Sequence, residues 1–421
     1  MTEFVATTAP GTAEPRAGKS IETRESWIAA SLVLGLLSIT YGSPLLAVVG
    51  LKPMTDDLGT ARQVVALASA LTWLGTGVGG IAMGLMAERL GIRFTVIFGT
   101  VMIAVGLAIS AAGDIWAILV GHALFVGFLG NGALYPPLLV YVSRWFDRRR
   151  GTALALISSG QYIAGMVWPT LFELAMSGYG WRATMVGFAA VMVVAVPIAA
   201  FFLREAPEPI GAVGFGPGAR RNNVLGMHPN TVLAMLCIAA FLCCIPMAIP
   251  QSHLVAFCTD IGISAVAGAA MLSVLQASAL VSRVFWGWLA DRIGGLKTVF
   301  AASASQALAV AAFMATQDEA GLFMISAAYG LGFSGIIPAY VVAIRELFPA
   351  REASWRVPSL LFIGMTGMAV GTWLAGALFD QFGFYTPAFV VGLVFNLFNL
   401  ALVWFLVVRQ RQAGGVRPAI A

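Results

Sequence analysis

Twelve apolar segments recur along the chain, and each is long enough to cross a lipid bilayer. The hydrocarbon core of a bilayer is about 30 Å thick, so a spanning α-helix needs about 20 residues. Because 59% of all residues are hydrophobic and only 10% are charged, a soluble globular protein is excluded. The sequence predicts an all-α polytopic membrane protein whose spans lie at roughly 27–50, 62–86, 94–112, 115–142, 152–176, 183–203, 231–257, 265–288, 296–315, 320–344, 355–378 and 385–408.

A thirteen-residue motif occurs twice, at a constant offset of 203 residues. GLMAERLGIRFTV begins at Gly84 and GWLADRIGGLKTV begins at Gly287. Such a duplication predicts two pseudo-symmetric six-helix halves. The expected domains are a disordered cytoplasmic tail (1–26), the N-terminal half (27–203), a central cytoplasmic loop (204–230), the C-terminal half (231–408) and a second cytoplasmic tail (409–421).

The basic residues predict the orientation of the spans. If both termini are cytoplasmic, the inner segments hold 20 of the 24 Lys and Arg residues, and only Lys52, Arg62 and Arg182 lie outside. This is the positive-inside pattern. It explains the net charge of +5 without a nucleic-acid partner. No removable signal peptide is expected before Trp27.

The remaining basic residue, Arg283, lies inside the eighth predicted span. A cation there costs about 2.5 kcal/mol or more on insertion scales and usually faces a functional partner. Gln276 precedes it by seven residues and so shares nearly the same helix face. Since no in-span carboxylate is expected at this depth, Arg283 indicates an anionic substrate. The alternative is that Arg283 bonds helix carbonyls or pairs with an acid at a helix end.

Further polar residues are candidates for the substrate site. Tyr41 precedes a Gly and a Pro that interrupt the first span, and Asn131 and Tyr135 are four residues apart on one face of the fourth. His122 lies nine residues before Asn131, about 180° away on an ideal α-helix, and is expected to be packed. His253 follows two prolines in the seventh span and either binds substrate, carries a proton or makes a structural hydrogen bond.

Proton coupling has two candidate carriers in this sequence, His253 and Glu173. Glu173 is the one acid expected inside a span, near its outer end. It either carries a proton or reaches the membrane interface, as long polar side chains do.

The acid and arginine of each repeated motif are expected at the cytoplasmic helix ends. There they can meet a neighbouring helix N-terminus or carboxylate in one conformer and separate in the other. They are therefore interpreted as cytoplasmic gates, which comprise Glu88, Arg89, Asp291 and Arg292.

Enzymatic activity is not expected. The sequence shows no nucleophile and base constellation, no metal-ligand spacing and no P-loop, so we expect no metal, no cofactor and no ATP-driven transport. The four cysteines, of which Cys243 and Cys244 are adjacent, are expected to be buried apolar fillers.

Several of these motifs resemble a known family. The two G-x-x-x-[DE]-R-x-G loops, the twelve spans and the long central loop resemble the major facilitator superfamily (MFS) over roughly residues 27 to 408. Within it, YGSPLLAVVGLKPMTDDLG, LYPPLLVYVSRWFDRRRGTALAL, SGYGWRA and SRVFWGWLADRIGG resemble the bacterial branch of monocarboxylate porters and the oxalate:formate exchanger. The resemblance implies an arginine in the eighth span that binds the substrate carboxylate, and Arg283 occupies that position.

The chain departs from that family's pattern at three positions. Gly364 stands where the oxalate exchanger has a second substrate-binding lysine, which suits a monoanion better than a dianion. Leu45 and Ala279 stand where animal monocarboxylate carriers have a lysine and an aspartate. The family's proton-coupling residues are therefore missing, and the coupling mode is left open.

The sequence thus predicts a secondary carrier that works by alternating access and transports a small organic monocarboxylate, by proton symport or anion exchange. Arg283, His253, Gln276, Asn131, Tyr135 and Tyr41 would form its substrate site. An efflux carrier for neutral or cationic compounds and a non-transporting sensor are the alternatives. The expected location is a bacterial inner membrane, with both termini cytoplasmic, and the expected state is a monomer with the lipid bilayer as its surroundings.

Overall fold

The computed structural model describes residues 22–146, 148–205 and 223–412. Residues 1–21 and 413–421 of the predicted tails and residues 206–222 of the predicted central loop lie outside these ranges, so these three domain assignments stay predictions.

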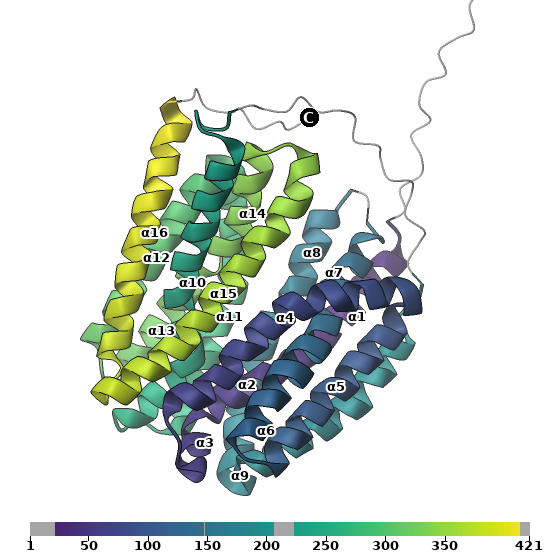
Figure 1. The fold of residues 1–421 in the computed structure, drawn as a ribbon, viewed down its shortest axis with the longest axis vertical. Coiled ribbons are helices and arrows are strands. Elements are labelled where there is room, and N and C mark those ends of the chain that lie inside the picture. The colour runs from purple at the N-terminus through teal and green to yellow at the C-terminus, as the bar shows by residue number, and fades with distance from the viewer. Residues whose placement is uncertain (1–21, 147, 206–222, 413–421) are drawn as a thin grey trace, which may run out of the picture.

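The described chain consists of helices in two groups, which we call the N-terminal and C-terminal halves (Figure 1). The N-terminal half comprises α1 (Arg24–Thr40), α2 (Gly42–Val49), α3 (Leu51–Leu58), α4 (Arg62–Leu90), α5 (Ile92–Ala112), α6 (Ile115–Val120), η1 (Gly121–Asn131), α7 (Gly132–Ser143), α8 (Arg150–Ser158) and α9 (Gly160–Phe201). The C-terminal half comprises α10 (Pro229–Asp260), α11 (Ala265–Ile293), α12 (Gly295–Ala315), α13 (Glu319–Phe333), α14 (Ile336–Leu347), α15 (Ala350–Phe382) and α16 (Thr386–Gln412).

Eleven helical stretches in the described ranges are long and apolar enough to cross a membrane. One of them, Gly151–Phe201, has 51 residues and is too long for a single crossing. Its backbone leaves the helical conformation at Gly180, where φ is 79° and ψ is 161°. The stretch therefore contains two spans, which confirms the predicted all-α membrane fold of twelve helices.

The repeated motif contains the same backbone turn in both halves. Gly91 between α4 and α5 has φ 85° and ψ 160°, and Gly294 between α11 and α12 has φ 86° and ψ 161°. Only glycine adopts this conformation without strain. The duplicated sequence thus forms a duplicated helix-to-helix connection.

One span is wound differently from the others. Residues Gly121–Asn131 form a π-helix, with i→i+5 hydrogen bonds. Glycines allow neighbouring helices to approach closely here: a Cβ on Gly79 would lie 2.1 Å from the Phe128 carbonyl oxygen. The 180° separation predicted for His122 and Asn131 assumed α-helical geometry, which this segment does not have, so that step of the sequence argument is wrong.

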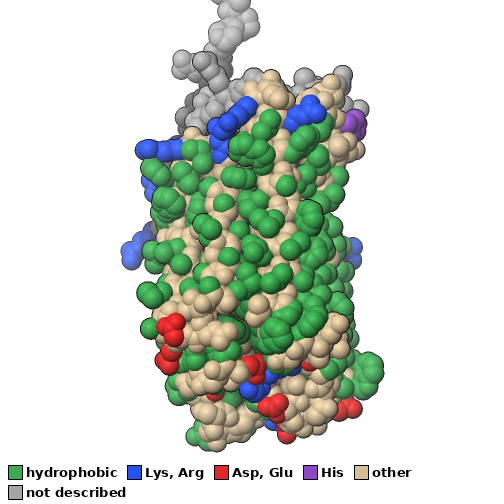
Figure 2. All heavy atoms as spheres, turned by 90° about the vertical axis from the view of Figure 1, so that its left-hand side faces the viewer, with side chains coloured by type: hydrophobic (Ala, Val, Ile, Leu, Met, Phe, Trp, Pro, Cys, Tyr) green, Lys and Arg blue, Asp and Glu red, His purple; other side chains and the backbone are tan. Residues whose placement is uncertain are grey.

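Charged residues distinguish the two ends of the helix bundle (Figure 2). We call the end that holds the described chain ends Glu22 and Gln412 the basic end, because exposed Lys and Arg side chains gather there: Arg89, Arg93, Arg148, Arg149, Arg204, Arg292, Lys297, Arg345, Arg409 and Arg411. We call the opposite end the acidic end, where the exposed acids are Asp56, Asp57, Asp114, Asp260, Asp318, Glu319 and Asp380.

The two halves meet through α4 with α15 and α9 with α11. Near the acidic end the contact is tight, since a Cβ on Gly376 of α15 would lie 2.9 Å from the Gln63 Cα atom of α4. Further along α4, Gly77 still faces Phe362 of α15. Gly84 is two helical turns closer to the basic end, and a Cβ there would meet nothing within 4 Å. The halves are therefore closed on each other at the acidic end and separated towards the basic end.

The bases at the acidic end are paired with acids. Lys52 and Arg62 bind Asp260 of the other half, and Arg182 binds Asp57 within the N-terminal half. The hydrogen bond from Arg182 lowers the pKa of the Asp57 carboxyl. The stability that this pair contributes is therefore present above the usual carboxyl pKa of about 3.9 and is lost as pH falls through the lowered value.

Candidate functional site

A small cavity of about 50 Å³ lies between the two halves, at the middle of the bundle. Its walls come from the α1–α2 junction, α2, α4 and α9 on one side and from α10, α11 and α15 on the other. The lining residues are Tyr41, Pro44, Leu45, Val48, Ser69, Trp73, Gln161, Gln251, Ser252, Gln276 and Met368. A mostly apolar wall with a few polar groups is typical of a small-molecule site.

Gln276 is the buried polar group in this cavity without a partner. Its side chain is 4% exposed, and its Oε1 atom has no hydrogen bond within the described residues. Gly165 of α9 leaves room for this side chain, because a Cβ at that glycine would lie 2.5 Å from the Gln276 Cγ atom. A buried amide oxygen left unpaired costs about 1–3 kcal/mol. This oxygen is therefore suited to accept a hydrogen bond from a ligand or a water molecule.

Arg283 lies two turns along α11 from Gln276, towards the basic end, and does not line the cavity. Its guanidinium carbon is 5.2 Å from the ring centroid of Tyr162 in α9. Within the part of the chain that the structure describes, no acid lies within ion-pair distance of it. Among the described residues its recorded partner is Tyr162, and a contact with an aromatic ring is a weak interaction for a positive charge.

Two of the predicted candidates on the N-terminal half, Tyr41 and Tyr135, lie at or beside the cavity. Tyr41 lines it, and the ring of Tyr135 packs edge-on against Tyr41 at 5.4 Å between centroids. Asn131, at the end of η1, is 3% exposed. His122 lies apart from them: its Nδ1 atom is 3.2 Å from Ser110 Oγ and 3.1 Å from the Ile118 carbonyl oxygen.

His253 follows the cavity residue Ser252 but faces the acidic end. Its Nδ1 atom lies 3.0 Å from the Tyr385 hydroxyl, and its Nε2 atom lies 2.8 Å from the Thr372 carbonyl oxygen. Both ring nitrogens are thus engaged by the protein.

Glu173 is buried in α9, with 8% of its surface exposed. It makes no hydrogen bond or ion pair with any residue that the structure describes. It is therefore a largely buried acid without a basic partner among the described residues.

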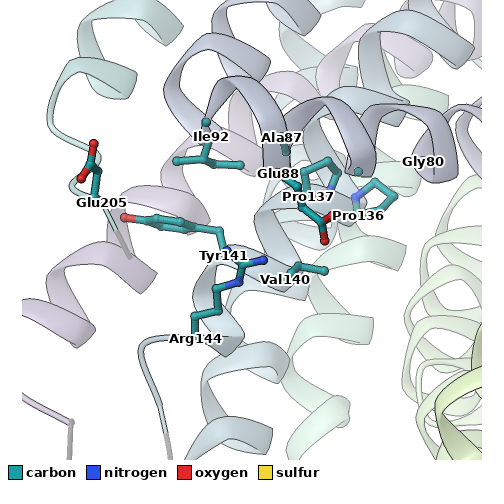
Figure 3. A pocket seen from close by; sticks show the side chains of 12 residues that line it. Gly80, Ala87, Glu88, Ile92, Pro136, Pro137, Val140, Tyr141, Arg144 and Glu205 are labelled. Carbon is teal, nitrogen blue, oxygen red and sulfur yellow. The ribbon is translucent and has the colours of Figure 1, made fainter. Parts of the chain in front are cut away.

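The predicted gate residues Glu88, Arg89, Asp291 and Arg292 are all exposed at the basic end. The Arg292 guanidinium lies 4.2 Å from the ring centroid of Trp288. Glu88 lines a pocket of about 350 Å³ in the N-terminal half, together with Tyr141, Arg144 and the proline pair of α7 (Figure 3).

Five polar or aromatic residues of the cavity wall were not predicted as site residues from the sequence: Ser69, Trp73, Gln161, Gln251 and Ser252. Their signal was present, since amides and hydroxyls inside apolar spans are unusual. Which of them share a cavity depends on how the halves pack.

Comparison with known sequences identifies the family. The sequence profile described as "Major Facilitator Superfamily" matches residues 28–355 and 236–421. Monocarboxylate transporter 13 of Rattus norvegicus is 28% identical over 351 residues, which cover 81% of this chain and 78% of the relative. Monocarboxylate transporter 11 of Homo sapiens is 24% identical over 381 residues, covering 87% and 79%. The MFS-type transporter pynF of Aspergillus niger is 24% identical over 327 residues, covering 76% and 73%.

Solved structures show the same fold. A bacterial homologue of the human lysosomal transporter Spinster, in an inward-facing and occupied conformation, has a TM-score of 0.71 at 15% identity, over 94% of this chain and 99% of that one. The nucleoside transporter NupG has a TM-score of 0.70 at 14% identity, over 91% and 99%. Together with the profile match, the repeated Gly91 and Gly294 turns and the twelve spans, this means that the chain belongs to the Major Facilitator Superfamily and is a transporter, not an enzyme.

Proposed function

We propose that this protein is a secondary transporter that carries a small organic monocarboxylate by alternating access, with proton symport or anion exchange. The observation that carries the proposal is Arg283. A guanidinium in a membrane span, without an acid among the described residues, is best completed by a substrate carboxylate held through two parallel hydrogen bonds.

The geometry of α11 supports a substrate bound along this helix. Gln276 and Arg283 both face α9, where they meet Gly165 and Tyr162. Seven residues correspond to about 10 Å along an α-helix. A small acid can therefore place its carboxylate at Arg283 and its remaining atoms towards the cavity that Gln276 and Tyr41 line.

The names of the relatives support the same substrate class. Two of them are monocarboxylate transporters. The identities of 28% and 24% are modest, so the substrate is proposed on the site and the relatives together. Tyr135 and Asn131 extend this proposed site.

The orientation is proposed from the charges of the two ends. If the basic end faces the cytoplasm, as the positive-inside rule favours, the separated halves describe an inward-open transporter. The gate residues Glu88, Arg89, Asp291 and Arg292 would then approach the opposite half when the basic end closes. The bacterial inner membrane and the monomeric state stay predictions of the sequence.

For proton coupling, the structure favours Glu173 over His253. The Glu173 carboxyl has no partner among the described residues, so it can gain or lose a proton without breaking a contact. Both ring nitrogens of His253 are engaged. We therefore propose Glu173 as the proton carrier in a symport mechanism.

The proposal is tested by the melting temperature of the purified protein with a panel of ligands. Formate, acetate, pyruvate and lactate represent monocarboxylates, oxalate a dianion, and glucose and a quaternary ammonium compound the other classes. A ligand that binds only the folded state increases the free energy of unfolding, by about 2.7 kcal/mol at a concentration of 100 times its Kd. The melting temperature rises as a result. We expect stabilisation by at least one monocarboxylate and a smaller effect of oxalate.

A different pattern of stabilising ligands would support the alternative function, efflux of neutral or cationic compounds. One relative is named the "Agnestins efflux protein AgnL12" of Paecilomyces divaricatus, so an efflux protein occurs among similar proteins. Stabilisation by the neutral or cationic compounds alone would overturn the monocarboxylate proposal. Arg283 would then have a structural role, in which it packs against Tyr162.

A further inference from the structure

An ion pair between a buried arginine and an acid at the protein surface closes the two halves at the acidic end. Arg62 of α4 is 6% exposed, and its guanidinium donates two hydrogen bonds to Asp260 of α10, one of them 2.8 Å long from Nη2 to Oδ1. It also lies over the ring of Phe379, 3.7 Å from the centroid. Its Nη1 atom donates to the Tyr385 hydroxyl at 3.1 Å. We call Arg62, Asp260 and Tyr385 the latch.

The latch continues inwards through His253. A carbonyl oxygen only accepts, so the His253 Nε2 atom, 2.8 Å from the Thr372 carbonyl, must carry a proton. In a neutral imidazole the Nδ1 atom is then an acceptor, and the Tyr385 hydroxyl donates to it at 3.0 Å. Burial raises the pKa of the Tyr385 hydroxyl, which keeps that proton in place. All hydrogen bonds from Arg62 to Thr372 therefore point in one direction.

The last member of this series reaches the central cavity. The Thr372 Oγ1 atom lies 3.0 Å from Ser252 Oγ, and Ser252 lines the cavity. Arg62, Tyr385, His253 and the Thr372 carbonyl are thus joined by hydrogen bonds, and the Thr372 side chain makes a separate hydrogen bond to Ser252. We call these contacts the series; it links the ion pair between the halves to the cavity wall through Thr372.

We propose that this series couples the central cavity to the closure of the acidic end, and that His253 is the positioning residue that holds Tyr385 against Arg62. The proposal rests on alternating access, as proposed above, but not on which substrate is carried. Opening the acidic end moves Arg62 away from Asp260 and Tyr385, which belong to the other half. The hydrogen bonds from Arg62 to Asp260 and Tyr385 cross between the halves and stabilise the closed state directly. The bonds that join Tyr385, His253, Thr372 and Ser252 lie within the C-terminal half, and they act on the closed state by positioning Tyr385.

Opening can be measured with a cysteine at Ala66. This residue is 1% exposed, and its Cβ atom lies 3.2 Å from the position of a Cβ on Gly376 of the opposite half. An Ala66→Cys thiol reacts with a maleimide only when the halves separate there. The same protein without this substitution gives the baseline from the four native cysteines, of which Cys243, Cys244 and Cys258 are buried.

The series is cut at three points in the Ala66→Cys protein. Tyr385→Phe removes the hydroxyl but keeps the ring against Phe379, and Asp260→Asn leaves Arg62 buried without a carboxylate. We expect each to raise the labelling rate several-fold, since one buried hydrogen bond or ion pair shifts a two-state equilibrium by about that much or more. Thr372→Val removes the contact with Ser252, and we expect a smaller rise.

Matched controls separate this effect from general loosening. Tyr340→Phe removes a buried hydroxyl that donates to Asn399 within the C-terminal half, and Asp57→Asn removes an acidic-end ion pair within the N-terminal half. Neither should change labelling at position 66. A cysteine at Ala133, fully buried inside the N-terminal half, should stay unlabelled in all variants.

Each result decides a part of the proposal. Equal labelling of Tyr385→Phe, Asp260→Asn and the parent Ala66→Cys protein would overturn the latch. A rise for those two without any rise for Thr372→Val would end the series at the Thr372 carbonyl and overturn the coupling to the cavity. The failure of every carboxylate in the ligand panel would leave this test unaffected, because it needs no substrate.

Discussion

Replacement of Arg283 by glutamine is expected to weaken binding of the transported monocarboxylate by about 100-fold. A hydrogen bond to a charged group contributes about 1.5–3 kcal/mol, and about 2.7 kcal/mol corresponds to 100-fold in affinity. Glutamine keeps much of the length and polarity of arginine but removes the charge and the planar pair of donors. The measurement is the Kd from ligand-dependent melting, together with uptake into proteoliposomes.

Two further variants define what the Arg283 result means. Arg283→Lys keeps the charge without the two-pronged donor geometry, and we expect affinity between those of the parent protein and Arg283→Gln. Arg345→Gln removes an exposed arginine at the basic end and should leave affinity unchanged. An Arg283→Gln protein that binds its carboxylate as well as the parent protein would refute the proposed anion site.

Alanine at Gly79 is expected to destabilise the protein by about 1–3 kcal/mol, the usual range for an overpacked interior. A Cβ there would lie 2.1 Å from the Phe128 carbonyl oxygen of η1, so α4 and the π-helix must move apart. The intrinsic helix preference acts in the opposite direction, because alanine is favoured over glycine by about 1 kcal/mol inside a helix. The expected readout is a lower melting temperature of the purified protein.

Gly84 is the matched position on the same helix. A Cβ there meets nothing within 4 Å, so Gly84→Ala should leave the melting temperature unchanged or raise it slightly. If alternating access closes the basic end, this face of α4 must approach the other half, and Gly84→Ala should then slow transport. Equal melting temperatures for Gly79→Ala and Gly84→Ala would contradict the close packing of α4 against η1.

The fold could be predicted from the sequence because membrane spans are local features. A run of about 20 apolar residues must be helical in lipid, whatever its neighbours are. The turns at Gly91 and Gly294 were likewise visible as a repeated motif. The break at Gly180 was expected as a gap between two spans, since Gly180 lies between the predicted segments 152–176 and 183–203.

The site could be predicted only in part, because it depends on contacts between residues far apart in the chain. Tyr41 and Gln276 were named as candidates, and the structure places both on the cavity wall. The partners of His253 come from residues 119 and 132 positions away, and the pairing of Arg62 with Asp260 spans 198 positions. No periodicity within one helix specifies such pairs.

The helix type of the fourth span could not be predicted from the sequence either. Nothing in the residue spacing of Gly121–Asn131 distinguishes a π-helix from an α-helix. The π-helix lies where α4 approaches closely, since Gly75 and Gly79 leave no room for side chains between the backbones. The relative placement of His122 and Asn131 is thus set by packing between helices.

The lone cation on α11 also has an electrical consequence. A charge that crosses the whole membrane field changes in energy by about 2.3 kcal/mol per 100 mV. With no acid beside Arg283 among the described residues, the empty site carries one positive charge while Glu173 is protonated, and a bound monocarboxylate cancels it. The membrane potential then acts on an empty carrier that keeps its proton and leaves the loaded site electrically silent, whereas an empty carrier that returns with Glu173 ionised is electrically silent as well.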